Sequence, residues 1–175
     1  DPARYETERL TITARDGTAV PVSIVAPAGF PKDGSGRLYL YGYGAYGLGM
    51  DPGFSTTRLS LLDRGFAYAI AHIRGGDELG QQWYLDGKLD KRTNSFTDFV
   101  DVVRARLTEE SERIGRPAHV VAAFDTELFG HWWYEGPQWL ARVLRALPEA
   151  GVQVGTLAGA IEAGYVGRPA ELPPS

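Results

Sequence analysis

The sequence predicts an α/β fold in which a mostly parallel sheet has helices packed on its faces and begins with an antiparallel hairpin. Two observations lead to this prediction. Residues 9–14 and 20–26 alternate apolar and polar side chains on either side of Asp16-Gly17, a pattern typical of a hairpin. From residue 37 onward, short apolar runs alternate with segments of helical periodicity. Such alternation predicts right-handed crossovers between parallel strands.

The next elements follow from local patterns. Residues 37–41 predict a short strand that runs into the glycine-rich segment 42–47. Residues 55–64 predict a helix, and Gly65 is a good residue to end it. The run 66–73 is almost continuously apolar, which favours a strand that is covered on both faces.

A longer helix is predicted to begin near Ser95. Ser95 and Asp98 have the spacing of a capping box, in which two side chains bond the free backbone donors of the first turn. The helix is expected to end near Gly115. Its apolar side is formed by Phe96, Phe99, Val103 and Leu107.

The last part of the chain continues the alternation. Residues 119–124 predict a buried strand, and Pro137 fits the first turn of a helix. Residues 152–156 predict one more short strand. The tail, residues 168–175, is rich in proline and is expected to be frayed.

Composition excludes several classes of function. The chain has 175 residues, the length of one domain, and a net charge of -4, which gives no basic field for nucleic acid. It has no cysteine, which excludes disulfides and thiolate metal sites and fits a reducing cytoplasm. No apolar run is long enough to cross a membrane, and the start at Asp1-Pro2 is expected to be a cut end rather than a signal peptide. The glycines of 74–80 lack the spacing of a phosphate-binding loop, so neither a cofactor nor a metal is expected.

Several motifs in the first hundred residues resemble the prolyl oligopeptidase family, and within it oligopeptidase B. These motifs are Tyr39-Leu-Tyr-Gly-Tyr-Gly-Ala-Tyr46, Leu61-Leu-Asp-Arg-Gly-Phe66, Ala71-His-Ile-Arg-Gly-Gly-Asp-Glu-Leu-Gly80, Trp83-Tyr-Leu-Asp-Gly-Lys-Leu89 and Asn94-Ser-Phe-Thr-Asp98. The resemblance implies a three-layer α/β-hydrolase-like fragment. It also implies that Tyr43 donates a hydrogen bond to the oxyanion of the reaction and that Tyr46 lines the adjacent pocket. A phenol suits that role chemically.

Taken without the resemblance, the tyrosines at 39, 41, 43 and 46 are more simply read as packing at the edge of a core. His72 lies inside an apolar run, so a satisfied core histidine is predicted rather than a catalytic one. The nucleophile of this fold stands on a Gly-x-Ser-x-Gly turn, and no such pentapeptide occurs in the chain. The late acid and histidine of the triad have no counterpart either. An oxyanion donor without nucleophile and base cannot complete a reaction.

A second resemblance begins at about residue 100 and extends to about 165. The block Phe124-Asp-Thr-Glu-Leu-Phe-Gly-His-Trp-Trp133 is similar to glycoside hydrolase family 57, and particularly to α-glucan branching enzymes. The resemblance implies that Asp125 is the general acid/base. Substrate-binding roles follow for Glu127, His131, Trp132 and Trp133, of which the tryptophans would stack on sugar rings.

Other readings of this block remain open. A lone aspartate at the end of a strand is commonly a turn or cap residue, and paired tryptophans are commonly core. Retaining glycosidases also need a second carboxylate across the sugar. The family supplies it from an earlier strand, which this chain lacks. Glu127 and Glu135 are poor substitutes because they belong to the same motif as Asp125.

The predicted organisation is an α/β-hydrolase-like segment over residues 1–100, a family 57-like segment over 101–165 and a tail over 166–175. The changeover falls within about 96–106, inside one predicted helix. We therefore expect a recombinant without complete catalytic activity. Two alternatives are a glucan-binding or glucan-acting remnant that uses Asp125, and a serine peptidase fragment that lacks its nucleophile. The expected ligand is an α-glucan or a peptide.

The join is also predicted to leave apolar surface uncovered. Trp132, Trp133 and Trp139 have lost the packing partners that their parent segment would supply. Exposed apolar patches favour association, so self-association or partial disorder of the second half is expected.

Overall fold

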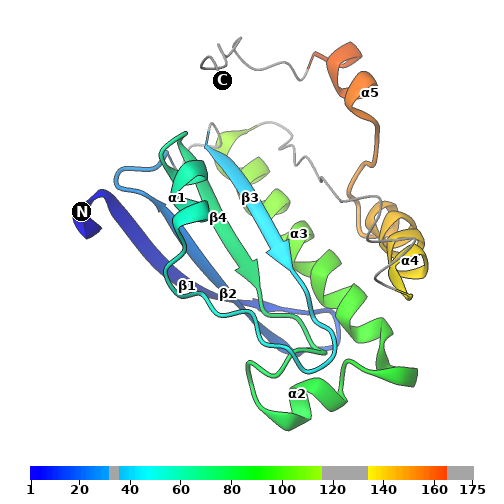
Figure 1. The fold of residues 1–175 in the computed structure, drawn as a ribbon. Coiled ribbons are helices and arrows are strands. Elements are labelled where there is room, and N and C mark those ends of the chain that lie inside the picture. Colours follow the sequence, from blue (N-terminus) through cyan, green and yellow to red (C-terminus); the bar gives the residue numbers. More distant parts are fainter. Residues whose placement is uncertain (32–35, 116–133, 165–175) are drawn as a thin grey trace.

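The computed structural model describes residues 1–31, 36–115 and 134–164 (Figure 1). Its strands are β1 (Tyr5–Thr13), β2 (Ala19–Pro27), β3 (Arg37–Gly42) and β4 (Phe66–Ala71). Its α-helices are α1 (Thr56–Leu62), α2 (Gln81–Leu85), α3 (Thr93–Ile114), α4 (Gly136–Glu149) and α5 (Leu157–Glu162). Short 3-10 helices occur at Pro2–Arg4 and Leu89–Lys91.

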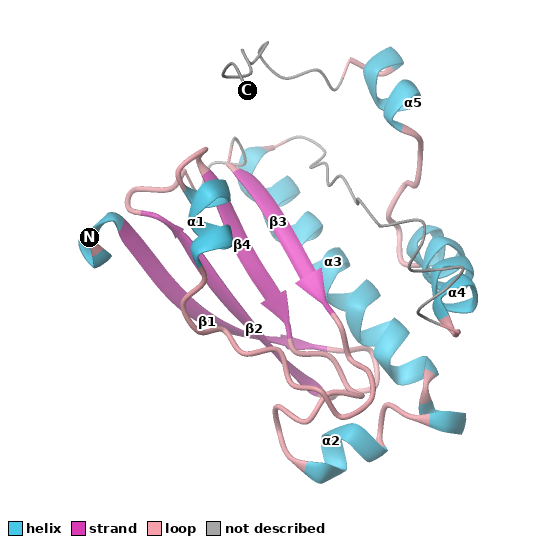
Figure 2. Ribbon diagram, viewed as in Figure 1, coloured by secondary structure: helices cyan, strands magenta, loops and turns pink. Residues whose placement is uncertain are grey.

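The sheet has the strand order β1-β2-β4-β3 (Figure 2). The predicted hairpin is confirmed, because β1 and β2 pair antiparallel around Asp16-Gly17. β4 pairs antiparallel with β2 and parallel with β3, so the described sheet is mixed and its parallel part is the β3–β4 pair. The strand expected at 119–124 lies outside the described residues.

Helices cover both faces of the sheet, which confirms the predicted α/β layering. In Figure 1, α3 lies behind the sheet and α1 lies in front of it. The core between the sheet and α3 contains the fully buried side chains of Val20 and Val22 of β2 and Val102 of α3. The alanines Ala69 and Ala71 of β4 belong to the same core.

The first turns of α3 differ from the capping box that the sequence predicts. The helix begins one residue after Arg92, and Ser95 and Asp98 already lie inside it. The Ser95 hydroxyl donates to the carbonyl of Arg74, and Asp98 accepts hydrogen bonds from the backbone N–H and the guanidinium of Arg74. Both side chains face Arg74 because residues three apart share one face of a helix. The predicted end is confirmed, since Gly115 caps the helix with φ of 67°.

Arg74 therefore joins three elements through one buried ion cluster. Its Nη2 lies 2.5 Å from Oδ1 of Asp98, and its Nη1 lies 2.7 Å from Oδ2 of Asp16 in the hairpin turn. Asp98 is fully buried and Arg74 is 5% exposed. A buried guanidinium needs such partners because an unpaired charge in the interior is very costly.

Asp16 gives the cluster a predicted dependence on pH. Partial burial raises its pKa, but hydrogen bonds from Thr18 and Arg74 outweigh burial and hold the pKa at about 2, below the ordinary 3.8. Because the folded pKa is depressed, the stabilisation is complete above about pH 4 and is lost as the pH falls towards 2. Asp16 is 42% exposed, so solvent screening limits the effect to about 1 kcal/mol or less.

The measurement compares urea unfolding of the wild type and Asp16→Asn. At neutral pH the variant should have the lower free energy of unfolding, and the difference should shrink steadily as the pH falls from about 4 to 2. A difference that stays constant between pH 5 and pH 2 would show that the charge of Asp16 does not stabilise the fold.

α4 packs against α3 through a second apolar cluster. Trp139 and Val143 of α4 and Phe96 and Val100 of α3 are all buried there. The rings of Phe99 and Trp139 are tilted by 59° with centroids 5.6 Å apart. The prediction that Trp139 is left uncovered is wrong, because α3 covers it and leaves it only 5% exposed. Trp132 and Trp133 lie outside the described residues.

The strand predicted at 152–156 does not form. These residues are irregular, pair with no strand in the described part of the chain, and lead directly into α5. The Thr156 side chain accepts a hydrogen bond from the N–H of Gly159, which fixes this helix start. Without a neighbouring strand, two alternating valines do not suffice to form one. On α5, Leu157 and Ile161 are 65% and 62% exposed, and self-association of this half stays a prediction.

Among the described helices, none combines the length and the apolar composition that crossing a membrane requires.

Candidate functional site

Tyr43 and Tyr46 occupy a tight loop that follows β3. Gly44 has φ of 58°, and a Cβ atom at this position would overlap the side chain of Ile73. Tyr46 has φ of 55°, which is uncommon for a residue with a large side chain. This backbone leaves Tyr43 half-buried and turns Tyr46 outward, where it is 58% exposed.

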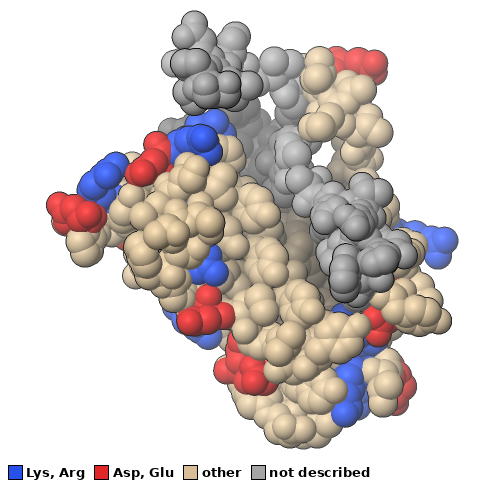
Figure 3. Space-filling view, viewed as in Figure 1, with Lys and Arg blue, Asp and Glu red and all other residues tan. Residues whose placement is uncertain are grey.

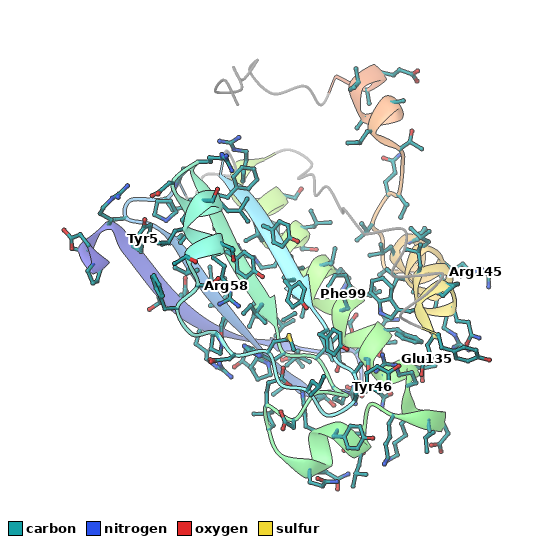
Figure 4. All side chains as sticks on the ribbon, in the orientation of Figure 1. Tyr5, Tyr46, Arg58, Phe99, Glu135 and Arg145 are labelled. Atoms are coloured by element: carbon teal, nitrogen blue, oxygen red, sulfur yellow. The ribbon has the colours of Figure 1, made fainter. Side chains whose placement is uncertain are left out.

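The Tyr46 side chain points to the start of α4 (Figure 4). Its hydroxyl donates to Oε2 of Glu135 at 3.2 Å, which links residues 89 positions apart. Partial burial, followed by the negative charge and the hydrogen bond of Glu135, raises the pKa of Tyr46. On the other side, the guanidinium of Arg92 donates to the carbonyl of Gly44, and desolvation lowers the pKa of Arg92. The loop thus faces a carboxylate as well as a cation.

This arrangement fixes Tyr46 and leaves the oxyanion role of Tyr43 untested. An oxyanion site needs donors aimed at a developing negative charge. Here the phenol of Tyr46 is already bonded to a carboxylate. The oxyanion role of Tyr43 and the pocket role of Tyr46 stay predictions that follow from the resemblance.

The predicted glucan-acting residues lie outside the described part of the chain. They are Asp125, Glu127, His131, Trp132 and Trp133. Their roles stay predictions. In the residues that the structure describes, no group of three or more potential ligand side chains could hold a metal ion.

One group of polar side chains, formed by Ser23, His72 and Glu78, was not predicted from the sequence. His72 is 1% exposed, which confirms a buried core histidine. Its Nε2 lies 2.8 Å from Oγ of Ser23, and its Nδ1 lies 3.4 Å from Oε1 of Glu78. Ser23 pairs with Ile70 across β2 and β4, so His72, two residues further on, is its diagonal neighbour on the same face. Only the strand register brings the serine and the histidine together, and the sequence gives no direct signal of register.

Ser23 lines an open groove of about 350 Å³ on the face of the sheet that carries α1. Arg9 and Arg58 line the same groove, and Nη1 of Arg9 donates to Oγ of Ser23 at 2.9 Å. The Arg58 guanidinium lies 5.1 Å from the ring centroid of Tyr68, which forms part of the wall. Figure 4 shows Arg58 over the strands on this face.

Glu78 holds the histidine from the opposite side. Burial raises the pKa of its carboxyl, but hydrogen bonds from His72 and from the backbone N–H of Met50 outweigh burial and lower the pKa. The group is therefore an ionised acceptor at neutral pH. An acceptor at this position requires that Nδ1 of His72 carry the proton.

Charges are interspersed on the face that Figure 3 shows. Basic and acidic side chains alternate there without a continuous basic stripe. This distribution agrees with the net charge of -4, and the expected absence of a nucleic-acid partner stays a prediction.

Comparison with known proteins finds two kinds of relative. Residues 52–137 match the model of the prolyl oligopeptidase family. Dipeptidyl aminopeptidase BI of Pseudoxanthomonas mexicana is 53% identical over 103 residues, which are 58% of this chain and 14% of the relative. A probable 1,4-alpha-glucan branching enzyme of Mycobacterium tuberculosis is 81% identical over 78 residues, which are 45% of this chain and 15% of the relative.

Solved structures agree with the first kind of relative. Oligopeptidase B from Leishmania major is 43% identical with a TM-score of 0.59, and the match covers 65% of this chain and 16% of that one. Oligopeptidase B from Trypanosoma brucei is 38% identical with a TM-score of 0.61, covering 63% of this chain and 16% of that one. The chain thus spans only about a sixth of the length of these relatives. The family match runs past residues 96–106, so it marks no boundary there. The N-terminal region of the chain is therefore similar in sequence to the prolyl oligopeptidase family and has the α/β-hydrolase fold.

Proposed function

We propose that the chain completes neither peptide hydrolysis nor glucan cleavage, and that it is a recombinant of a serine oligopeptidase-like fragment and an α-glucan branching enzyme-like fragment. The observation that carries the proposal is that the sequence contains no Gly-x-Ser-x-Gly turn to present a nucleophile. Two kinds of relative, each matched over a small part of its length, support the recombinant origin.

The physical argument concerns the missing nucleophile and the proposed oxyanion donor, Tyr43. Hydrolysis of a peptide passes through a tetrahedral intermediate whose oxygen becomes negative. The carboxylate of Glu135 already holds the phenol of Tyr46, in the loop that also carries Tyr43. Without the nucleophile of the Gly-x-Ser-x-Gly turn, an oxyanion donor at Tyr43 has no intermediate to stabilise. In this proposal the segment of 1–100 serves as a scaffold and not as a peptidase.

A second candidate is a remnant that binds or acts on α-glucan. The 81% identity to a probable branching enzyme over 78 residues favours it. In this candidate Asp125 acts as general acid/base, while Trp132 and Trp133 stack on sugar rings. A third candidate, a peptidase fragment that lends its oxyanion donor to sequence outside this chain, rests on Tyr43 alone.

One set of assays separates the candidates. Fluorogenic peptides with basic or prolyl residues should give no turnover above buffer, and branching of soluble amylose should not be detected. Titration with soluble glucan should leave tryptophan fluorescence unchanged. A fluorescence change that disappears in the double variant Trp132→Ala, Trp133→Ala but persists in Trp83→Phe would instead establish the glucan-binding candidate. Peptide turnover by the purified wild type would refute the main proposal.

A further inference from the structure

The groove on the α1 face carries a hydroxyl, an imidazole and a carboxylate in a line. We propose that Ser23 is a reactive nucleophile, activated by His72, and that small activated esters and phosphonates modify it from this groove. The site uses none of the residues assigned to peptide or glucan chemistry. It therefore goes beyond the proposed function, and a test of one does not decide the other.

The hydrogen bonds define the direction in which the proton would move. The guanidinium of Arg9 can only donate, so Oγ of Ser23 accepts from it. The hydroxyl proton is then free to point to Nε2 of His72, 2.8 Å away. Because Glu78 accepts the proton of Nδ1, Nε2 is the ring nitrogen that can accept the proton of Ser23. The serine thus faces a base that is held in the productive tautomer.

The order of groups is that of a serine–histidine–acid triad, which is recognised by geometry and not by position in the chain. Nucleophile and base lie within hydrogen-bonding reach, as nucleophilic catalysis requires. The bond from His72 to Glu78 is longer, at 3.4 Å, but the carboxylate is itself fixed by the N–H of Met50 at 3.0 Å. Glu78 is therefore a positioning residue for the ring.

A small molecule in the groove can reach the hydroxyl of Ser23 but not the imidazole of His72. Ser23 lines the groove, whereas His72 lies behind it and is 1% exposed. The guanidinium of Arg9, at the exposed rim, stands next to Oγ, where the oxygen of an attacked ester or phosphonate would become negative. A groove of about 350 Å³ beside Tyr68 suits a short acyl or phosphonyl group with an aryl or alkyl arm. It does not suit a folded polypeptide substrate.

The covalent step balances without a further reactant. With a fluorophosphonate, the bond between Oγ of Ser23 and phosphorus forms and the phosphorus–fluorine bond breaks. Fluoride leaves with the bonding pair, and the hydroxyl proton passes to Nε2 of His72 and then to solvent. With an aryl ester, the phenolate leaves and the acyl group stays on Ser23.

The test treats the full chain with an alkyl fluorophosphonate and locates the adduct by peptide mass spectrometry. Ser55 is the matched internal control, because it is half-buried like Ser23 and its hydroxyl bonds Thr57, at 2.8 Å, instead of an imidazole. A positioned base typically accelerates such a step by about 100-fold or more. Ser23 should therefore be labelled about 100 times faster than Ser55. Equal slow labelling of both serines in the folded protein would overturn the proposal.

Variants separate reactivity from folding. Ser23→Ala should remove the fast adduct, and Ser55→Ala should leave it unchanged. Arg9→Met alters an exposed side chain and should slow labelling about tenfold while the circular dichroism spectrum stays the same. Glu78→Gln should slow it as well, and Glu78→Asp should restore part of the rate. An Arg9→Met variant labelled at the wild-type rate would exclude the role of this groove. Peptide turnover that survives Ser23→Ala would refute the proposed function and not this site.

Discussion

Replacing Asp98 by alanine should destabilise the fold by about 3–5 kcal/mol, the usual cost of removing one partner of a buried ion pair. The carboxylate accepts from the backbone N–H of Arg74 at 3.0 Å and from its guanidinium at 2.9 and 2.5 Å. Without Asp98, the buried guanidinium keeps Asp16 as its one ionic partner among the described residues. The donors left unpaired, and not the lost attraction, account for most of the expected loss.

Urea unfolding, followed by circular dichroism, gives the free energy difference. Asp63→Ala is the matched control, because its ion pair with Arg4 at 3.0 Å is exposed by 48% and 62% on its two sides. Such surface pairs contribute about 0–1 kcal/mol. Equal losses for the two variants would mean that burial of the Arg74 pair does not matter for stability.

The sequence predicted those parts of the fold that depend on local pattern. The hairpin around Asp16-Gly17 needs only alternation and a turn, and it forms as expected. β4 is apolar on both faces because it lies between two other strands and two layers of helix. Gly115 ends α3 because a left-handed backbone conformation at that point is easy only for glycine.

The parts that failed depend on partners distant in sequence. Ser95 and Asp98 have the spacing of a helix cap, but the buried side chain and carbonyl of Arg74 take up both groups. Residues 152–156 have some strand character, yet no strand edge lies beside them in the described structure. Local propensity is a weak prior when a tertiary partner is present or missing.

The candidate sites also divide into features that follow from local sequence and features that depend on distant residues. The pocket role of Tyr46 stays a prediction, and its hydrogen bond to Glu135, a residue from the second resemblance, has no signal in the sequence. The set of Ser23, His72 and Glu78 depends on the register of β2 against β4 and on the loop after β4. Sequence motifs could not reveal it, because a triad is defined by distances between residues that no fixed spacing connects.

The contact between α3 and α4 leads to the second large expected effect. Trp139→Ala should cost about 3–5 kcal/mol, because truncating a buried aromatic side chain removes contacts and leaves a cavity. Trp139 contacts Phe99 and is 5% exposed in the cluster that joins α4 to α3. The loss should appear first as opening of α4, since this cluster is the apolar contact that holds the helix.

Amide hydrogen exchange measures that opening directly. In Trp139→Ala the amides of α4 should lose protection, while those of β2 and β4 keep theirs. Tyr134→Ala is the control, because Tyr134 is 87% exposed and its removal should change stability by less than about 0.5 kcal/mol. Loss of protection in the sheet as well would show that the two clusters form one cooperative unit. Packing between two helices depends on the volume and shape of their apolar side chains and not on a common origin. A helix from the second kind of relative, α4, can therefore cover α3 if the apolar face of α4 is wide enough.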